Sequence, residues 1–172
     1  MRIIKTKKIA DPEAVVSLPA IIAGSFFYSG FFPVASGTVG SLAALIILFI
    51  EPALHPAVLL SLVIIFFVAG TVSAGPIMKR YGDDPSVIVV DEVVGMWITI
   101  LLFVAFGKTE MSFFNAGACF LFFRLFDIIK IQPAKYFDER KTAFGVMMDD
   151  VVAGIYAGIV CVIISYTGFN PF

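Results

Sequence analysis

The sequence contains little charge: Asp, Glu, Lys and Arg make up 15% of its 172 residues, and the formal net charge is −1. Soluble domains usually carry about 25% charged residues. Without a basic excess, the chain lacks the electrostatic signature of a nucleic-acid-binding protein. Cysteine is also scarce, and both copies, Cys119 and Cys161, lie in apolar runs. They are therefore predicted to be buried thiols rather than a disulfide framework.

Apolar residues are correspondingly abundant: 60% of the chain is hydrophobic and the mean hydropathy is +1.01. This apolar surface is too large for one small core, so part of it must face lipid. The length is that of a single domain. The sequence therefore predicts one membrane-embedded domain over residues 1–172, surrounded by a lipid bilayer, and leaves the oligomeric state open.

Prolines and glycines divide the apolar sequence into stretches of helical length. Each stretch except the first is near the ~20 residues that a spanning helix needs. The expected fold is an all-α polytopic bundle of about five spanning helices, at 38–50, 57–78, 88–106, 112–130 and 146–166. The earlier stretch 14–32 contains Pro19, Gly24 and Gly30, which disfavour a straight helix. It is predicted to be an N-terminal interfacial or re-entrant helix.

Lysine and arginine are distributed unequally among the loops. Four of them lie in the tail 1–13, and others lie in loops 79–87 and 130–145, whereas the remaining loops carry few. The positive-inside rule therefore places these three segments in the cytoplasm. If 14–32 crossed the membrane, the charge pattern after it would invert. The tail resembles the start of a signal peptide, but residues 14–50 carry no charge, and that stretch is far longer than a signal h-region.

Two acidic pairs, Asp91-Glu92 and Asp149-Asp150, recur in similar surroundings. Each is expected in the first turn of an apolar helix, at the cytoplasmic end, followed by small residues that allow close helix packing. Carboxylates at a helix N-terminus are favoured by the helix dipole, which offers a purely structural explanation. Four carboxylates brought together would repel one another unless a cation lay between them. Oxygen ligands without nearby His or Cys suit Mg²⁺.

Arg124 and Asp127 lie three residues apart and therefore on one helical face. They form either a local salt bridge or part of a site in which Asp127 joins the metal ligands and Arg124 binds phosphate, since guanidinium matches phosphate geometry. Lys130 is a further candidate for phosphate contact, although positive-inside retention explains it equally well.

The segment Ser36–Ser41 precedes an apolar helix and is rich in glycine and hydroxyl residues. Glycines permit tight turns, hydroxyls cap helix N-termini, and such termini bind phosphate. The segment is not a nucleotide P-loop because no Gly-Lys-Ser/Thr follows. The candidate phosphate-binding residues here are Ser36, Gly37, Thr38, Gly40 and Ser41.

Several phosphatase mechanisms do not fit the sequence. His55, the only histidine, is expected in a loop on the opposite side, and no Asp-x-Asp is present. Cys119 and Arg124 are one residue too close for the Cys-x5-Arg spacing of thiolate phosphatases. Metal-assisted attack by water remains, with one free carboxylate as general base.

Four segments together resemble the phosphatidylglycerophosphatase A family, in order and spacing, across roughly residues 30–165. They are Ser36–Ala44, Asp91–Trp97, Phe123–Asp127 and Gly145–Gly154. The resemblance implies an all-helical, Mg²⁺-dependent enzyme of the bacterial inner membrane that hydrolyses the phospholipid phosphatidylglycerophosphate to phosphatidylglycerol. Family members often carry Pro-Trp-Pro after the lysine that corresponds to Lys130, where this chain has Ile131-Gln132-Pro133.

The predicted metal-binding and catalytic residues are Asp91, Glu92, Asp127, Asp149 and Asp150. A cation-coupled transporter or channel is the alternative, because acidic residues also line ion pathways. Transport sites lie near the bilayer midplane, however, whereas these acids are expected at one membrane face. That placement favours an enzyme acting on an interfacial headgroup.

Overall fold

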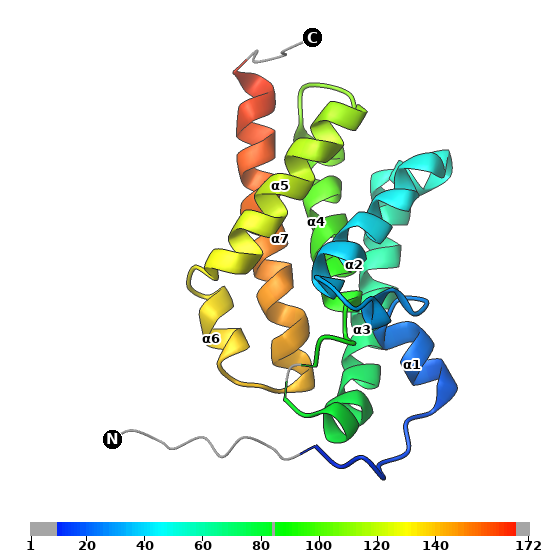
Figure 1. The fold of residues 1–172 in the computed structure, drawn as a ribbon. Coiled ribbons are helices and arrows are strands. Elements are labelled where there is room, and N and C mark those ends of the chain that lie inside the picture. The colour runs from blue at the N-terminus through cyan, green and yellow to red at the C-terminus, as the bar shows by residue number, and fades with distance from the viewer. Residues whose placement is uncertain (1–9, 84, 168–172) are drawn as a thin grey trace.

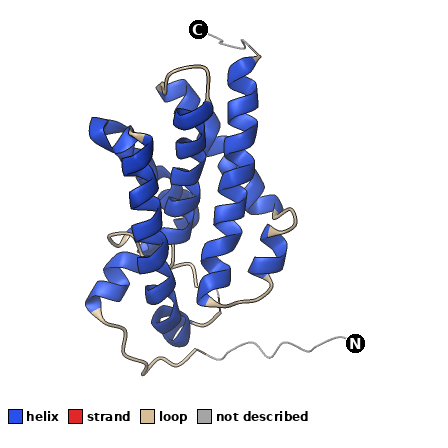
Figure 2. Ribbon diagram, turned by 180° about the vertical axis from the view of Figure 1, so that it is seen from behind, coloured by secondary structure: helices blue, strands red, loops and turns tan. Residues whose placement is uncertain are grey.

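The computed structural model describes residues 10–83 and 85–167. Within these ranges every regular element is helical and no strand occurs (Figure 2). The all-α prediction is therefore confirmed for the described residues. The longer helices are α2 (Ser36–Ala44), α3 (Pro56–Tyr81), α4 (Val90–Phe106), α5 (Phe113–Ile129) and α7 (Ala143–Tyr166). The short ones are α1 (Leu18–Gly24), α6 (Ala134–Asp138) and the 3-10 turns η1 (Ser29–Phe31), η2 (Leu45–Phe49) and η3 (Glu51–Leu54).

Helix α4 occupies the middle of the bundle, where it packs against α2, α3, α5 and α7 (Figure 1). Glycines bring α4 and α7 into backbone contact. A Cβ atom added at Gly95 would lie 2.6 Å from the carbonyl oxygen of Asp150, and one at Gly154 would strike the carbonyl oxygen of Gly95. Thr99 Oγ1 donates to the carbonyl oxygens of both glycines, at 3.0 and 3.1 Å. Small residues thus set the α4–α7 spacing, as they do where helices pack within membranes.

Two helices, α3 and α7, are long and apolar enough to cross a membrane by length and composition. Helices α4 and α5 have 17 residues each. The expected span 38–50 is not one α-helix. The α-helix α2 ends at Ala44, and the 3-10 turn η2 follows from Leu45 to Phe49. The predicted number of about five spanning helices is therefore not confirmed.

The segment 14–32 is broken, as its prolines and glycines predict. Helix α1 has only seven residues, and Phe26, Phe27 and Tyr28 then adopt positive φ angles before η1. The side chain of Ser25 stabilises this turn, since its Oγ donates to the Ile21 carbonyl oxygen at 2.6 Å and accepts from the Tyr28 amide at 3.0 Å. The break keeps this segment folded against α3 instead of continuing as a straight helix.

The basic loops lie at one end of the bundle. Figure 1 shows the end of α3, the start of α4, the end of α5, α6 and the start of α7 toward the lower end, whereas α3 begins and α4 ends at the upper end. Most of the predicted tail, residues 1–9, lies outside the described residues. Cys119 and Cys161 are buried and free, as predicted.

Candidate active site

Three carboxylates converge where α4 and α7 pack together. Asp91, Glu92 and Asp150 each offer an oxygen, and these oxygens all lie within 4.8 Å of one another. Asp91 and Asp150 are only 7% and 4% exposed. Helix α4 begins at Val90, so its two acids occupy the first turn, and the glycine contacts with α7 bring Asp150 to them. The two acidic pairs of the sequence therefore contribute to one cluster.

Helix α7 begins earlier than the sequence analysis expects. Thr142 caps it by accepting a hydrogen bond from the Gly145 amide at 3.0 Å, so the helix begins at Ala143 and Asp149-Asp150 lie in its second turn. The expectation that this pair occupies the first turn is wrong. Because the dipole effect falls off within the first turn, helix capping accounts for the carboxylates of α4 but not for those of α7.

Asp149 is bound by a lysine outside the cluster. Lys130 Nζ lies 2.7 Å from Asp149 Oδ2 and 2.8 Å from Asp138 Oδ1. Lys141 Nζ also lies 3.0 Å from Asp138 Oδ1. Burial would raise the pKa of the Asp138 carboxyl, but the hydrogen bonds from Lys130 and Lys141 outweigh it and hold that pKa below its usual value. Lys130, predicted to contact phosphate, thus links α5, α6 and α7 by ion pairs.

Arg124 forms the salt bridge with Asp127 that the sequence left as an alternative, with Nη1 2.8 Å from Oδ2. The same nitrogen lies 3.4 Å from Ser41 Oγ on α2. Asp127 is not one of the three clustered residues, although its carboxyl group interacts with those of Glu92 and Asp150. Arg124 therefore lies beside the carboxylate cluster, between α2 and α5.

The segment Ser36–Ser41 forms the first turns of α2, not a loop. None of its hydroxyls caps the helix, and Ser41 Oγ donates instead to the Gly37 carbonyl oxygen at 2.9 Å. A Cβ atom at Gly37 would collide with Glu92 Oε1 and lie 3.4 Å from Arg124 Nη1, and one at Gly40 would lie 2.8 Å from Val89 Cβ. The predicted role of the glycines in a tight turn is therefore wrong: they allow α2 to pack closely on the start of α4.

The remaining predicted residues of this segment are also near the cluster end of α2. Ser36 is buried and Thr38 is half-buried in the same first turn as Gly37. The structure thus brings α2, α4, α5 and α7 together at the predicted site, with Asp149 and Lys130 paired to each other at its edge.

The donor set fits a divalent cation. Glu92 Oε2 is buried and has no hydrogen-bond partner among the described residues. A buried carboxylate oxygen without a partner is costly, and a bound cation would satisfy it. The three residues offer only carboxylate oxygens, which suit Mg²⁺ better than a softer metal.

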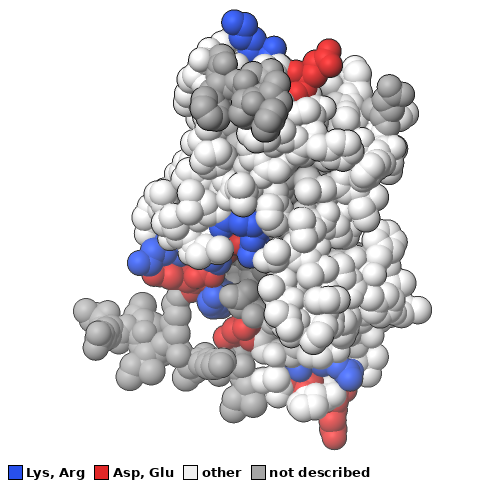
Figure 3. Space-filling model, turned by 45° about the horizontal axis from the view of Figure 1, so that its top comes forward, with Lys and Arg blue, Asp and Glu red and all other residues white. Residues whose placement is uncertain are grey.

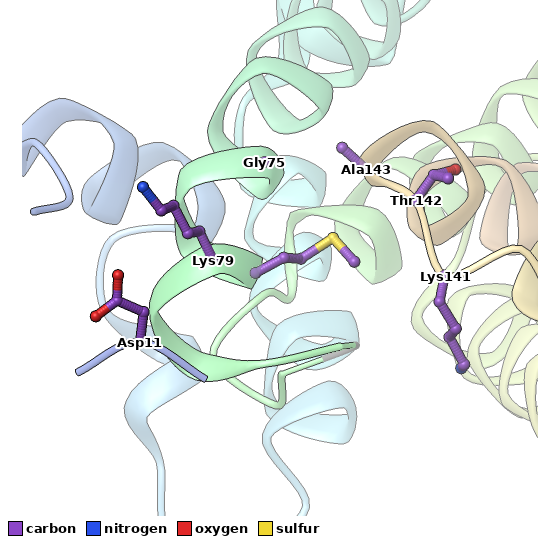
Figure 4. A pocket seen from close by; sticks show the side chains of 7 residues that line it. Asp11, Gly75, Lys79, Lys141, Thr142 and Ala143 are labelled. Atoms are coloured by element: carbon purple, nitrogen blue, oxygen red, sulfur yellow. The ribbon is translucent and has the colours of Figure 1, made fainter. Parts of the chain in front are cut away.

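Charged side chains gather in few places on the surface. Figure 3 shows side chains of both signs around a hollow in a face that is otherwise largely uncharged. At the lower end a separate cavity of about 500 Å³ opens between α3 and α7, with Lys79 and Lys141 on opposite sides (Figure 4). No carboxylate of the cluster lines this cavity, but Lys141 connects it to the site through Asp138.

Asp138 and Lys141 belong to the ion-pair network at the edge of the site, and neither was predicted from the sequence. The loop 130–145 was predicted only to carry positive charge and, at Lys130, a candidate phosphate contact. A single aspartate in a loop has no periodicity or spacing that marks it, and its partners become visible only once α6 has folded against α7.

Comparison with known proteins identifies the chain's relatives. The family model described as Phosphatidylglycerophosphatase A matches residues 22–165. A Bacteroides thetaiotaomicron protein, provisionally named a phosphatidylinositol-3-phosphatase, is 41% identical over 147 residues, covering 83% of this chain and 90% of the relative. Phosphatidylglycerophosphatase A of Escherichia coli is 35% identical, covering 89% of this chain and 88% of the relative. The Haemophilus influenzae protein of the same name is 36% identical, covering 91% and 96%. No solved structure matches the chain.

The helical fold, the site and these relatives together define an enzyme of the phosphatase class. More particularly, the chain belongs to the phosphatidylglycerophosphatase A family, which confirms the family resemblance of the four sequence segments.

Proposed function

We propose that this enzyme hydrolyses phosphatidylglycerophosphate to phosphatidylglycerol and phosphate, as a step of phospholipid synthesis, with Mg²⁺ as its cofactor. The observation that carries the proposal is the cluster of Asp91, Glu92 and Asp150, with the unpartnered Glu92 Oε2 and Arg124 beside it. The names of the Escherichia coli and Haemophilus influenzae relatives support this substrate.

The residues have separate roles in this proposal. Asp91, Glu92 and Asp150 would hold the metal, with Asp127 and Asp149 at the edge of the site. Arg124 would orient the phosphate, and its ion pair with Asp127 limits the positions that its guanidinium can take. Within the segment Ser36–Ser41, the amide N–H groups of the first turn of α2 would donate to phosphate oxygens, because the Val39 amide already donates to the Ala35 carbonyl oxygen. Lys130 keeps Asp149 paired and supplies positive charge near the leaving phosphate.

When bound, Mg²⁺ would neutralise phosphate oxygens and lower the pKa of an attacking water. A carboxylate of the site that does not ligate the metal would accept the proton from that water. The burial of Asp91 and Asp150 limits access by bulk water, which strengthens the electrostatic contribution of Arg124 and of the carboxylates.

We also propose that the bundle lies in the bacterial cytoplasmic membrane with the site facing the cytoplasm. The chain first forms the short elements α1, η1, α2 and η2 over residues 18–49. The longer helices α3, α4, α5 and α7 then run back and forth between the two ends of the bundle (Figure 1). The 17 residues of α4 or α5 extend about 25 Å at 1.5 Å per residue, close to the thickness of the hydrocarbon layer. Exposed apolar side chains on the outer surface, such as Val72 and Leu121, would face lipid.

A second substrate is favoured by one observation, the 41% identity to the Bacteroides relative named for phosphatidylinositol 3-phosphate. Both lipids carry a phosphate monoester on the headgroup, so the same cluster would serve either. The transporter or channel alternative gains no support, because the relatives are named as phosphatases and Asp91 and Glu92 lie in the first turn of α4 and not in its middle.

The deciding experiment is phosphate release by purified protein in detergent micelles. We expect release from phosphatidylglycerophosphate in Mg²⁺, no release in excess chelator, and recovery when Mg²⁺ is restored. Phosphatidylinositol 3-phosphate assayed in parallel assigns the substrate by the ratio of kcat/KM values. Activity that persists in chelator after extensive dialysis would contradict the metal assignment, and release from neither lipid would contradict the proposed function.

A further inference from the structure

An apolar groove of about 720 Å³ lies outside the carboxylate cluster. It is bounded by the α1–η1 turn, α2 with η2 and η3, α3 and α4, and its lining includes Phe26, Ala43, Ala53, Phe66 and Trp97. Ser29 supplies the only hydroxyl among the residues that line it. A recess of this volume and composition is typical of sites that take an apolar ligand.

The base of the groove is held in a fixed position. Trp97 is 5% exposed, and its Nε1 donates to the Ala44 carbonyl oxygen at 2.9 Å. Its ring makes edge-on contacts with Phe66 and Phe26, with centroids 5.0 and 5.9 Å apart. Because the polar atom of Trp97 is satisfied inside the protein, only apolar ring surface remains for a ligand. The groove is therefore built for hydrocarbon.

The groove and the carboxylate cluster share helix α4, and α2 contacts the cluster at Gly37 and lines the groove at Ala43, but the two sites differ in depth. Trp97 lies five residues beyond Glu92 on α4, or about 7.5 Å along the axis at 1.5 Å per residue. Ala43 lies seven residues beyond Ser36 on α2, or about 10 Å. The groove therefore begins deeper in the bundle than the cluster and extends toward the opposite end. A lipid whose phosphate reaches the cluster has its hydrocarbon at this depth.

We propose that this groove binds one acyl chain of the phospholipid substrate. The inference rests on the proposed function, because it assumes a lipid phosphate at the carboxylate cluster. The occupant is a long hydrocarbon chain, and each methylene that packs into the groove adds van der Waals contacts with its apolar lining. The groove thereby makes the enzyme prefer membrane lipid over water-soluble phosphate esters of the same headgroup.

Filling the groove tests this directly. Ala43→Phe and Ala53→Phe place a ring in the groove, and Val72→Phe adds the same ring on the outer surface of α3, where Val72 is 71% exposed. Phosphate release is measured with dipalmitoyl and dihexanoyl phosphatidylglycerophosphate in the same micelles. Each groove variant should raise KM for the dipalmitoyl lipid at least tenfold, with KM for the dihexanoyl lipid and both kcat values unchanged. The control variant should change neither.

An equal change for both lipids, or no change, in variants with wild-type thermal unfolding would overturn the proposal. If no variant and no wild-type protein releases phosphate from either lipid, the proposed function itself fails. The chain-length ratio therefore separates the two failures.

A second measurement needs no turnover. Trp97 is the only tryptophan of the chain, so its fluorescence reports on the groove alone. Phosphatidylglycerol with brominated acyl chains, added to protein in micelles, should quench Trp97, and Ala43→Phe should remove at least half of this quenching. Val72→Phe should leave the quenching as it is. Equal quenching in wild type and Ala43→Phe would mean that the bromines act from the outer surface, which would overturn the proposal.

Discussion

The ammonium group of Lys130 lies 2.7 Å from the carboxylate of Asp149. Its neighbour Asp150 belongs instead to the cluster with Asp91 and Glu92. Two adjacent aspartates, alike in sequence, thus have different partners because successive helical residues point about 100° apart. The relationship divides the predicted metal ligands into an inner group and a paired residue at the edge.

The inner group should behave as one unit. We expect Asp91→Asn and Asp150→Asn each to lower kcat at least 100-fold, about 2.7 kcal/mol, and the double variant to be scarcely worse than the worse single one. Asp149→Asn should cost less than tenfold, because Asp138 still neutralises Lys130. Kinetics at saturating Mg²⁺ with thermal unfolding as a fold check measure this. Two small losses that multiply would mean that the two helices do not share a metal.

Arg124→Lys tests phosphate binding. Lysine keeps the charge but loses the planar fork that matches phosphate. We expect kcat/KM to fall at least tenfold, about 1.4 kcal/mol of transition-state stabilisation, and competitive inhibition by inorganic phosphate to weaken. Unchanged kinetics in a normally folded variant would assign Arg124 a purely structural pairing with Asp127.

Gly37→Ala tests the approach of α2 to the cluster. The new methyl group would collide with Glu92 Oε1, so either α2 or the carboxylate must shift, and activity should fall at least tenfold. Gly117→Ala on α5 is the matched control, because a Cβ there meets nothing within 4 Å. That control should keep full activity and gain up to about 1 kcal/mol of stability. Equal activity in both variants would show that the Gly37 contact does not matter to the reaction.

Asp138→Asn tests the ion pairs of α6 through pH. Because the folded pKa of Asp138 is depressed, its contribution to stability is present above the unfolded pKa of about 3.9. That contribution disappears as pH falls through the folded pKa. The variant should lose about 1 kcal/mol at pH 7, and the difference from wild type should shrink as pH falls below the unfolded pKa and through the lower folded pKa of Asp138. Glu139→Gln, at an exposed position next in sequence, is the control and should show little difference at either pH. Thermal unfolding from pH 7 to 3 measures both.

Cysteine labelling tests the orientation. Lys135→Cys and Lys108→Cys place exposed thiols at opposite ends of the bundle, while Cys119 and Cys161 are buried. An impermeant thiol reagent outside intact cells should label position 108 and spare position 135. The reverse pattern would place the carboxylate cluster on the outer side.

Much of the fold was predictable because apolar runs of helical length leave few alternatives. The boundaries of α3 and α5 fall within three residues of their expected ends. The first acidic pair was predictable for the same reason, since Val90 begins an uninterrupted apolar helix. Broken segments were harder: α2 changes to a 3-10 turn at Leu45, and no sequence period marks that change.

The candidate site residues could be chosen from the sequence, but their arrangement could not. The sequence predicted both acidic pairs at helix starts, which is right for α4 and wrong for α7. Which of these carboxylates converge depends on how α4 and α7 are rotated about their axes. That rotation is set by the contact of Gly95 with Gly154, which involves backbone atoms far apart in sequence. The hydrogen bond from the Gly145 amide to Thr142 Oγ1 starts α7 early enough to place Asp149 and Asp150 in its second turn. This cap depends on local backbone geometry that the sequence does not specify.

The backbone contact between Gly95 and Gly154 is also the point of closest approach of α4 and α7 near the carboxylates. Each glycine lies four residues beyond a cluster carboxylate, Asp91 on α4 and Asp150 on α7, which is about 6 Å along the helix. A change in the crossing angle of α4 and α7 would turn the two helices about this close contact. The distance from this contact to the carboxylates is short, and the distance to the far ends of α4 and α7 is longer. Such a change would therefore displace the far helix ends much more than Asp91, Glu92 and Asp150, so the contact protects the spacing of these carboxylates.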